Sequence, residues 1–239
     1  MLKISVTLLS KPRLVLAASS FCLFLLMTAL QLYSNSLQGW NVSCHQWLQT
    51  HHYTNLNTVL MSMTLMADDP IIILITAAVC YLMAAQAQWN NIIRFIATLG
   101  IGYSLMLSIK YGLQVPRPIS MAGLGPYAYP SGHTLAATLT YGMLFLYCRP
   151  FLLKPFQHLL FMSILALVAG IAFSRVYFGF HWPADVFASL FLGIFILSVT
   201  RFTDTAKTPR RLILTILTTV IASIVYQVLV LPVSLHAIT

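Results

Sequence analysis

Long apolar runs dominate this sequence, and they constrain its fold more than any other feature. A helix needs roughly 20 residues to cross the hydrocarbon core of a bilayer. None of the runs alternates with a period of two, and seven segments do not suit a closed barrel of alternating strands, so helices are expected. The seven runs lie near 14–33, 70–86, 92–112, 133–148, 156–174, 182–200 and 212–231.

The composition agrees with a lipid environment. Hydrophobic residues make up 59% of the 239 positions and charged residues only 7%, whereas a soluble domain uses the two classes far more evenly. No internal repeat or low-complexity linker divides the chain. We predict an all-α fold, a polytopic transmembrane helical bundle with six core spans and a possible seventh C-terminal span, in a single integral membrane domain over residues 1–239.

The N-terminal run is expected to remain in the membrane as the first span. Lys3, Lys11 and Arg13 precede it, which resembles the start of a secretory signal peptide. The apolar stretch that follows, 14–32, is longer than such a signal needs. It is therefore predicted to stay in the chain as a membrane anchor.

A polar segment, 34–58, separates the first two spans and is predicted to lie at the outer membrane surface. It carries Trp40 and Trp47, and tryptophan is enriched where the bilayer meets water. His45 and His52 would share one face of a helix, which raises the alternative of a metal site. No carboxylate or thiolate pattern accompanies them, so we prefer to interpret them as interfacial polar residues.

The positions of lysine and arginine predict the orientation, because cytoplasmic loops are enriched in both. With the N-terminus inside, cytoplasmic segments hold ten of the thirteen basic residues, and 202–239 forms a cytoplasmic loop and the extra span. The net charge of +9 comes from basic residues placed singly, so no nucleic-acid partner is expected. The other three, Lys110, Arg117 and Arg175, fall on the outer side and need another explanation.

Three polar clusters interrupt the apolar pattern, and all three fall at span ends on the outer side. The first closes the third span, the second opens the fourth, and the third joins the fifth to the sixth. Helices that alternate in direction bring these ends to one membrane face, so one site can gather all three clusters. The clusters are Lys110-x6-Arg117-Pro118, Pro130-Ser131-Gly132-His133 and Ser174-Arg175-x5-His181-x3-Asp185.

The residue types in these clusters suit a phosphate group. The guanidinium of Arg117 or Arg175 pairs two oxygens at once, and Lys110 adds a compact positive charge. Ser131 and Gly132 stand where a helix is predicted to begin. Unpaired backbone N–H groups there favour an anion, and glycine lets the backbone approach it closely.

Two histidines in the clusters can supply the chemistry, because histidine titrates near neutral pH. Asp185 lies four residues beyond His181, a spacing that lets the carboxylate fix one ring nitrogen and leave the other facing phosphorus. We therefore predict His181 as the nucleophile. His133, on a separate segment, is predicted to donate a proton to the leaving oxygen, and water then releases phosphate from a phosphohistidine intermediate.

The three clusters resemble those of the type 2 phosphatidic acid phosphatases, membrane relatives of bacterial acid phosphatases and vanadium haloperoxidases. The resemblance covers about 60–200 and is complete at the defining positions. It implies a helical bundle, usually of six spans, and a lipid phosphatase activity. The family's roles, carried over, imply phosphate binding by Lys110, Arg117, Ser131, Gly132 and Arg175, and catalysis by His181, His133 and Asp185.

The resemblance also implies a reaction without a metal, and the sequence agrees. Metal-assisted phosphoryl transfer usually needs several converging carboxylates. The chain has no glutamate, and its acids are Asp68, Asp69, Asp185 and Asp204. Asp204 falls on the cytoplasmic side of the predicted topology. We expect no metal and no other cofactor.

Each of these residue types also has a structural interpretation. A basic residue at a span end, such as Lys110 or Arg175, can reach toward the headgroups. A buried histidine can be a polar side chain satisfied between helices. Asp68 and Asp69 precede Pro70 at the start of the second span, where helix capping is the preferred interpretation and a supporting role near the headgroup is the alternative.

The leading functional hypothesis is hydrolysis of a phosphate monoester or diphosphate of a membrane lipid, in a bacterial inner membrane with the site on the periplasmic face. Undecaprenyl diphosphate, phosphatidylglycerol phosphate, phosphatidate and lipid A phosphate present the same group, and no motif selects among them. One alternative is a phosphotransferase that passes the phosphoryl group to another lipid or a sugar. Another is a transporter that moves an anion or lipid. The sequence does not indicate an oligomeric state.

Overall fold

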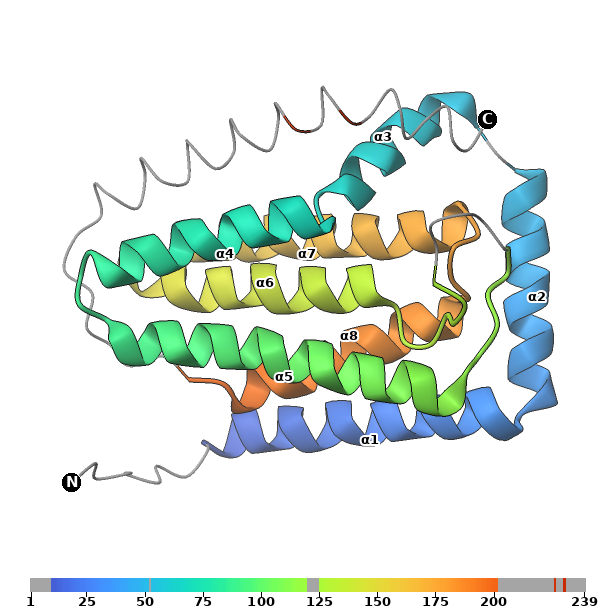
Figure 1. Ribbon diagram of the computed structural model, residues 1–239, viewed down its shortest axis with the longest axis horizontal. Coiled ribbons are helices and arrows are strands. Elements are labelled where there is room, and N and C mark those ends of the chain that lie inside the picture. Colours follow the sequence, from blue (N-terminus) through green and yellow to red (C-terminus); the bar gives the residue numbers. More distant parts are fainter. Residues whose placement is uncertain (1–9, 52, 120–124, 202–225, 227–229, 231–239) are drawn as a thin grey trace.

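The described part of the chain folds into helices, which confirms the all-α prediction for these residues (Figure 1). The only strand-like pairing in that part is an isolated antiparallel bridge between Pro116 and Tyr127. The computed structural model describes residues 10–51, 53–119, 125–201, 226 and 230.

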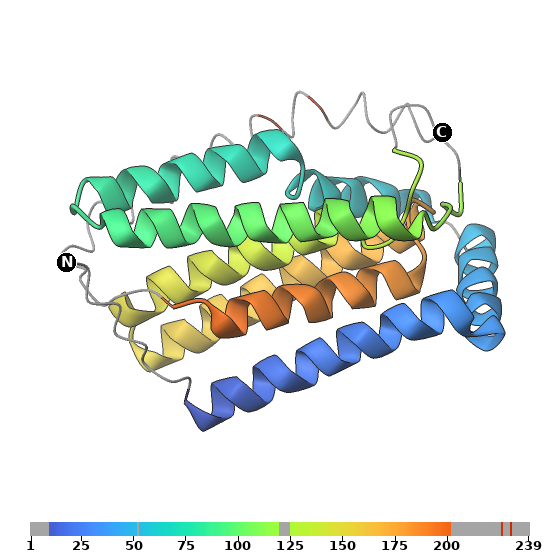
Figure 2. The same cartoon turned by 60° about the horizontal axis from the view of Figure 1, so that its bottom comes forward.

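Eight α-helices and one short 3-10 turn follow one another in the described residues. They are α1 (Lys11–Tyr33), α2 (Asn35–Thr50), α3 (Thr54–Leu65), α4 (Asp69–Ala84), α5 (Trp89–Leu113), α6 (Gly132–Cys148), η1 (Arg149–Phe151), α7 (Lys154–Tyr177) and α8 (Pro183–Val199). Figures 1 and 2 show α1 and α4 to α8 running along the long axis of the molecule, while α2 stands across one end.

Helix α6 lies at the centre of the bundle and packs against α5, α7 and α8. Its buried side chains include Leu135, Leu139 and Met143. The contact with α8 is close, because a Cβ atom placed on Gly193 would lie 2.6 Å from Cγ2 of Thr138. Only glycine lets the two helices approach this closely. Gly193 therefore sets the separation of α6 and α8, which both carry residues of the candidate site.

Helices α1, α5 and α7 are each long and apolar enough to cross a membrane. They contain three of the predicted spans, 14–33, 92–112 and 156–174. Large apolar side chains stay exposed on them, including Leu26 on α1 and Leu165 on α7. Such side chains are stable in contact with lipid, where burying them in protein brings little gain.

The remaining predicted spans differ from these three. The run at 70–86 forms α4, which meets α3 at 45° and qualifies as a span only together with it. The runs at 133–148 and 182–200 form α6 and α8, whose 17 residues each are fewer than a straight crossing usually needs. The run at 212–231 lies outside the described residues except for two positions. The count of six spans therefore stays a prediction.

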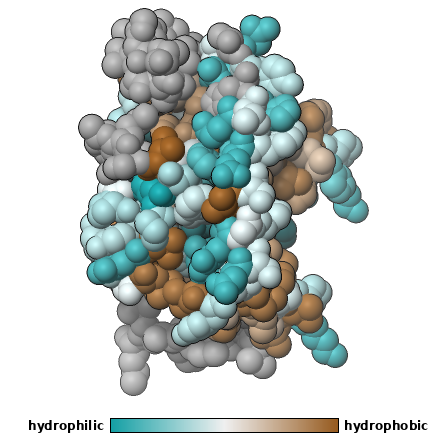
Figure 3. Space-filling view, turned by 90° about the vertical axis from the view of Figure 1, so that its right-hand side faces the viewer, coloured by the Kyte–Doolittle hydropathy of each residue, from teal (hydrophilic) through white to brown (hydrophobic). Residues whose placement is uncertain are grey.

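The polar segment after the first span forms α2 and the start of α3. Asn41 of α2 is 3% exposed; its Oδ1 accepts the backbone N–H of Ala184 at 3.2 Å, and its Nδ2 donates to Gln31. The first bond holds α2 against the first turn of α8, and the second holds it against the end of α1. Figure 3 looks onto this end of the molecule, where hydrophilic surface runs between hydrophobic patches. The alternative metal site stays untested, because His52 lies outside the described residues.

Candidate active site

Four helix ends meet at the end of the bundle that α2 crosses (Figure 1). They are the last turns of α5 and α7 and the first turns of α6 and α8, which alternate in direction along the chain. The three sequence clusters therefore lie at one end of the molecule, as their spacing predicted. The side chains that this arrangement gathers are Lys110, Arg117, Ser131, His133, Arg175, His181 and Asp185.

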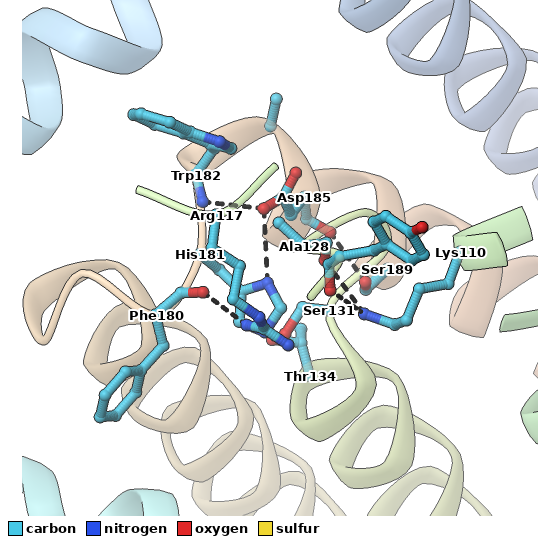
Figure 4. Close-up of polar contacts among 12 residues, drawn as sticks. Lys110, Arg117, Ala128, Ser131, Thr134, Phe180, His181, Trp182, Asp185 and Ser189 are labelled. Atoms are coloured by element: carbon cyan, nitrogen blue, oxygen red, sulfur yellow. Dashed lines mark hydrogen bonds and ion pairs between the residues drawn. The ribbon is translucent and has the colours of Figure 1, made fainter. Parts of the chain in front are cut away.

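His181 and Asp185 form a buried pair (Figure 4). The Nδ1 atom of His181 lies 3.3 Å from Oδ2 of Asp185, and the backbone N–H of Trp182 donates to the same oxygen at 2.8 Å. The two side chains are 2% and 0% exposed. Asp185 lies in the first turn of α8 and accepts from the backbone N–H of Trp182, which precedes that helix. The start of α8 therefore holds the carboxylate in place, and the carboxylate orients the ring of His181.

Arg117 indicates how the two nitrogens of His181 are protonated. Its Nη1 lies 3.2 Å from Nε2 of His181 and also donates to the carbonyl of Phe180 at 2.6 Å. Arginine has only donors, so Nε2 must face it with a lone pair and Nδ1 must carry the proton toward Asp185. A neutral imidazole with its Nε2 lone pair beside a guanidinium is the form required of a nucleophile.

The electrostatic surroundings favour that neutral form. Burial lowers the pKa of His181 well below its usual value, and the positive charges of Arg175, Arg117 and Lys110 act in the same direction. The imidazole therefore stays uncharged at neutral pH, with one proton on Nδ1. The cations around it favour binding of an anion. Arg117 itself is held by Gly125, whose carbonyl accepts from Nε at 2.5 Å.

Arg175 is a buried cation with an unused donor. It is 4% exposed, its Nη1 donates to Oγ1 of Thr64 at 3.0 Å, and its guanidinium carbon lies 4.4 Å from the centre of the Phe180 ring. Its Nε has no hydrogen-bond partner in the described structure. An unsatisfied buried donor costs about 1–3 kcal/mol, more when charged, so a bound anion is the expected partner.

Lys110 points into the loop that precedes α6. Its Nζ donates to the backbone carbonyls of Tyr127 and Ala128, at 2.9 and 3.3 Å (Figure 4). An ammonium group has three protons, so one donor remains for a ligand. The lysine thus ties α5 to the loop that carries Ser131 and adds positive charge next to it.

Ser131 and Gly132 form the beginning of α6. Ser131 is fully buried, and its Oγ accepts a hydrogen bond from Thr134 at 3.0 Å. A Cβ atom added to Gly132 would meet only the Met106 side chain, at an ordinary 3.6 Å. Packing within the protein therefore does not require glycine at this position, and glycine keeps the backbone open to close approach by a ligand.

His133 has a partner that the sequence did not reveal. Its Nε2 lies 3.0 Å from Oδ1 of Asp68, and Oδ2 of Asp68 accepts from the hydroxyl of Tyr226 at 3.1 Å. Asp68 does occupy the N-cap position of α4, but its side chain makes no capping hydrogen bond. The capping interpretation was therefore wrong for this carboxylate, because it accepts a hydrogen bond from His133, 65 positions away in the chain, instead of from the start of α4.

The comparisons with known proteins identify the family. A model described as the PAP2 superfamily matches residues 91–209, which contain all three clusters. The chain belongs to the PAP2 superfamily. This confirms the family resemblance drawn from the motifs and makes the chain a phosphoric ester hydrolase. Its apolar helices make this PAP2 protein an integral membrane protein.

A solved structure has the same PAP2 fold. It is described as the first transmembrane PAP2 type phosphatidylglycerolphosphate phosphatase, from Bacillus subtilis. The two chains are 21% identical, and the match covers 76% of this chain and 92% of that one with a TM-score of 0.66. No curated protein sequence matches the chain significantly. In the described residues of this PAP2 chain, no three His, Cys, Asp or Glu side chains group closely enough to hold a metal ion.

Proposed function

We propose that this PAP2 protein is a metal-independent lipid phosphatase that works through a phosphohistidine at His181. The observation that carries the proposal is the orientation of that ring, with Nδ1 toward Asp185 and the Nε2 lone pair toward Arg117. A buried guanidinium with a free donor, Arg175, lies in the same site. Together they provide a nucleophile and an anion site within one group of contacts.

The first step transfers the phosphoryl group to the protein. Arg117, Arg175 and the N–H groups at the start of α6 hold the phosphate oxygens, and Nε2 of His181 attacks phosphorus. A bond forms between Nε2 and phosphorus while the bond to the lipid oxygen breaks. His133 gives its proton to that oxygen, so the lipid leaves as a neutral alcohol or, from a diphosphate, as a monophosphate.

The second step returns the protein to its starting state. The neutral His133 removes a proton from a water molecule, which attacks phosphorus and breaks the bond to Nε2 of His181. Phosphate leaves, and His133 is protonated again. Asp185 keeps the Nδ1 proton in place throughout and stabilises the positive charge on the ring while phosphorus is attached.

The substrate is proposed to be a lipid that carries a terminal phosphate and reaches the site sideways from the bilayer at the outer face of a bacterial inner membrane. The site lies at a bundle end with hydrophilic surface, next to helices whose sides are apolar (Figure 3). Undecaprenyl diphosphate, phosphatidylglycerol phosphate, phosphatidate and lipid A phosphate all fit this description. The structurally similar protein is described as a phosphatidylglycerolphosphate phosphatase, which makes that lipid the first to test.

Phosphate release by purified protein in detergent tests the proposal. Each of the four lipid phosphates is supplied with a metal chelator present, and we expect at least one to be hydrolysed. His181→Ala should abolish the activity, while His158→Ala, an exposed histidine near the start of α7, should leave it unchanged. No release from any lipid, or equal release by wild type and His181→Ala, would contradict the proposal.

A further inference from the structure

We propose that Asp68 is a positioning residue that holds His133 as the proton donor and makes the site selective for phosphate monoesters over diphosphates. This inference rests on the proposed function. It arises from a carboxylate that contacts a motif histidine but does not belong to the motifs, on the segment between α3 and α4.

Both oxygens of Asp68 are held in place. Oδ1 accepts from Nε2 of His133 at 3.0 Å, and Oδ2 accepts from the Tyr226 hydroxyl at 3.1 Å. The backbone is held as well, since Asp68 directly precedes α4 and its own N–H bonds to the carbonyl of Leu65 at 3.1 Å. A carboxylate fixed at both oxygens can fix the ring that it binds.

The contact determines which nitrogen of His133 gives up its proton. Nε2 is bound to Asp68, so Nδ1 is the nitrogen that we assign to the leaving oxygen. The arrangement repeats that of His181, where Asp185 binds one nitrogen and the other faces phosphorus. Once the Nδ1 proton moves to the leaving oxygen, His133 is neutral and still donates from Nε2 to Asp68.

The charges around His133 oppose one another. The carboxylates of Asp68 and Asp69 lie at the start of α4, the guanidinium of Arg175 lies on α7, and His181 lies across the site. Asp68 is the nearest of these and the only one in direct contact with the ring. Removing its charge should therefore make the imidazolium lose its proton at lower pH.

The same carboxylate gives a reason for substrate selection. An alcohol leaving from a monoester departs as a strongly basic oxygen and depends on the proton from His133. A diphosphate leaves a weakly basic lipid monophosphate, which needs that proton less. The leaving monophosphate is also an anion, and at His133 it would lie beside the carboxylate of Asp68, where like charges repel.

Two substrates of different leaving group test the inference. Phosphatidate and a prenyl diphosphate are hydrolysed in detergent by wild type, Asp68→Asn and the matched control Asp69→Asn, whose aspartate is exposed. For Asp68→Asn we expect phosphatidate kcat to fall about tenfold to a hundredfold, and diphosphate kcat to change far less. The alkaline limb of the phosphatidate rate should move to lower pH, and Asp69→Asn, which removes an exposed carboxylate, should move it far less.

The possible outcomes distinguish a positioning role of Asp68 from a general loss of folding in the variant. A loss of equal size for both substrates, an unchanged pH profile, or a wild type that prefers the diphosphate would overturn the inference. Asp68→Glu, which keeps the charge, should recover part of the phosphatidate rate, and size-exclusion chromatography checks that each variant is folded. An active wild type with an inactive His181→Ala shows that the proposed function holds even if Asp68→Asn behaves like wild type.

Discussion

At the scale of single residues, the protonation of His181 is set by the groups around it. A histidine has a usual pKa of about 6.5, but burial and three nearby cations lower the pKa of His181 far below that value. The neutral form that attacks phosphorus is therefore present across the neutral range and is lost only as the pH falls through the lowered pKa. The acid limb of kcat/KM reports this titration in the free enzyme.

We predict that Arg117→Gln moves that acid limb to higher pH. The substitution removes a positive charge 3.2 Å from Nε2, so the pKa of His181 rises toward its usual value. The measurement is kcat/KM against pH for wild type and variant on one substrate, so that ionisation of the substrate itself cancels. An acid limb at the same pH in both proteins would contradict this account, whatever the change in KM.

Gly132→Ala should leave the fold intact and weaken the phosphate site. The added methyl group meets only Met106 at an ordinary distance, but it stands at the start of α6 where the phosphate is proposed to bind. We expect kcat/KM to fall about tenfold or more with an unchanged melting temperature in detergent. Gly100→Ala on α5, where the methyl group enters open space, is the control. A large drop in melting temperature for Gly132→Ala would point to packing instead.

Residue identity and spacing predicted most of the side chains that the fold brings together in the candidate site, and the folded chain added Asp68. The clusters around Lys110, His133 and His181 were visible because each carries a distinctive spacing. Asp68 was not, because it lies 65 residues from His133 and precedes a proline in a pattern typical of helix starts. Its role depends on the turn between α3 and α4, which no local sequence signal reports.

At the scale of helices, the position of the site depends on how closely α6 and α8 approach. Ser131 begins one helix and Asp185 lies in the first turn of the other, and the backbone N–H of Ser131 donates to the carbonyl of Asp185 at 3.3 Å. Glycine at 193 sets the spacing further along the same pair. The hydropathy pattern predicted that both helices exist but could not predict this contact, because it depends on side-chain size across the interface.

Gly193→Ala should therefore destabilise the protein and impair the site together. Its methyl group would lie 2.6 Å from Cγ2 of Thr138, too close for either helix to keep its place. Overpacking of this kind costs about 1–3 kcal/mol, which thermal unfolding in detergent measures. Thr138→Ser removes the clashing methyl and should recover part of the stability in the double variant. No destabilisation relative to the Gly100→Ala control would show that the helices are farther apart than described.

At the scale of the whole molecule, the distribution of charge predicts the orientation in the membrane. Ten of the thirteen basic residues lie on the predicted cytoplasmic side, while the site collects three at the other end of the bundle. Helices α1, α5 and α7 agree with the predicted spans, and α6 and α8 match the predicted runs 133–148 and 182–200 to within one residue at each end. With 17 residues each, α6 and α8 are shorter than a straight crossing usually needs, which suits helices that are buried at the centre of a bundle and do not meet lipid along their whole length.

Labelling of single cysteines tests the orientation. In a chain whose four cysteines are replaced, Trp47→Cys on α2 and Leu153→Cys before α7 place exposed thiols at opposite ends of the bundle. A thiol reagent that cannot cross the inner membrane should label position 47 in cells with a permeable outer membrane and leave position 153 unlabelled. The reverse pattern would place the site on the cytoplasmic face.

The phosphorylated form of the protein tests the central claim most directly. Lipid phosphate labelled on its terminal phosphorus is mixed with the protein and quenched within one turnover, and the protein is analysed for covalent label by mass spectrometry. The account predicts an acid-labile phosphohistidine at His181 that is absent from His181→Ala and present in His158→Ala. Hydrolysis that proceeds without any labelled protein, or a label that remains in His181→Ala, would contradict it.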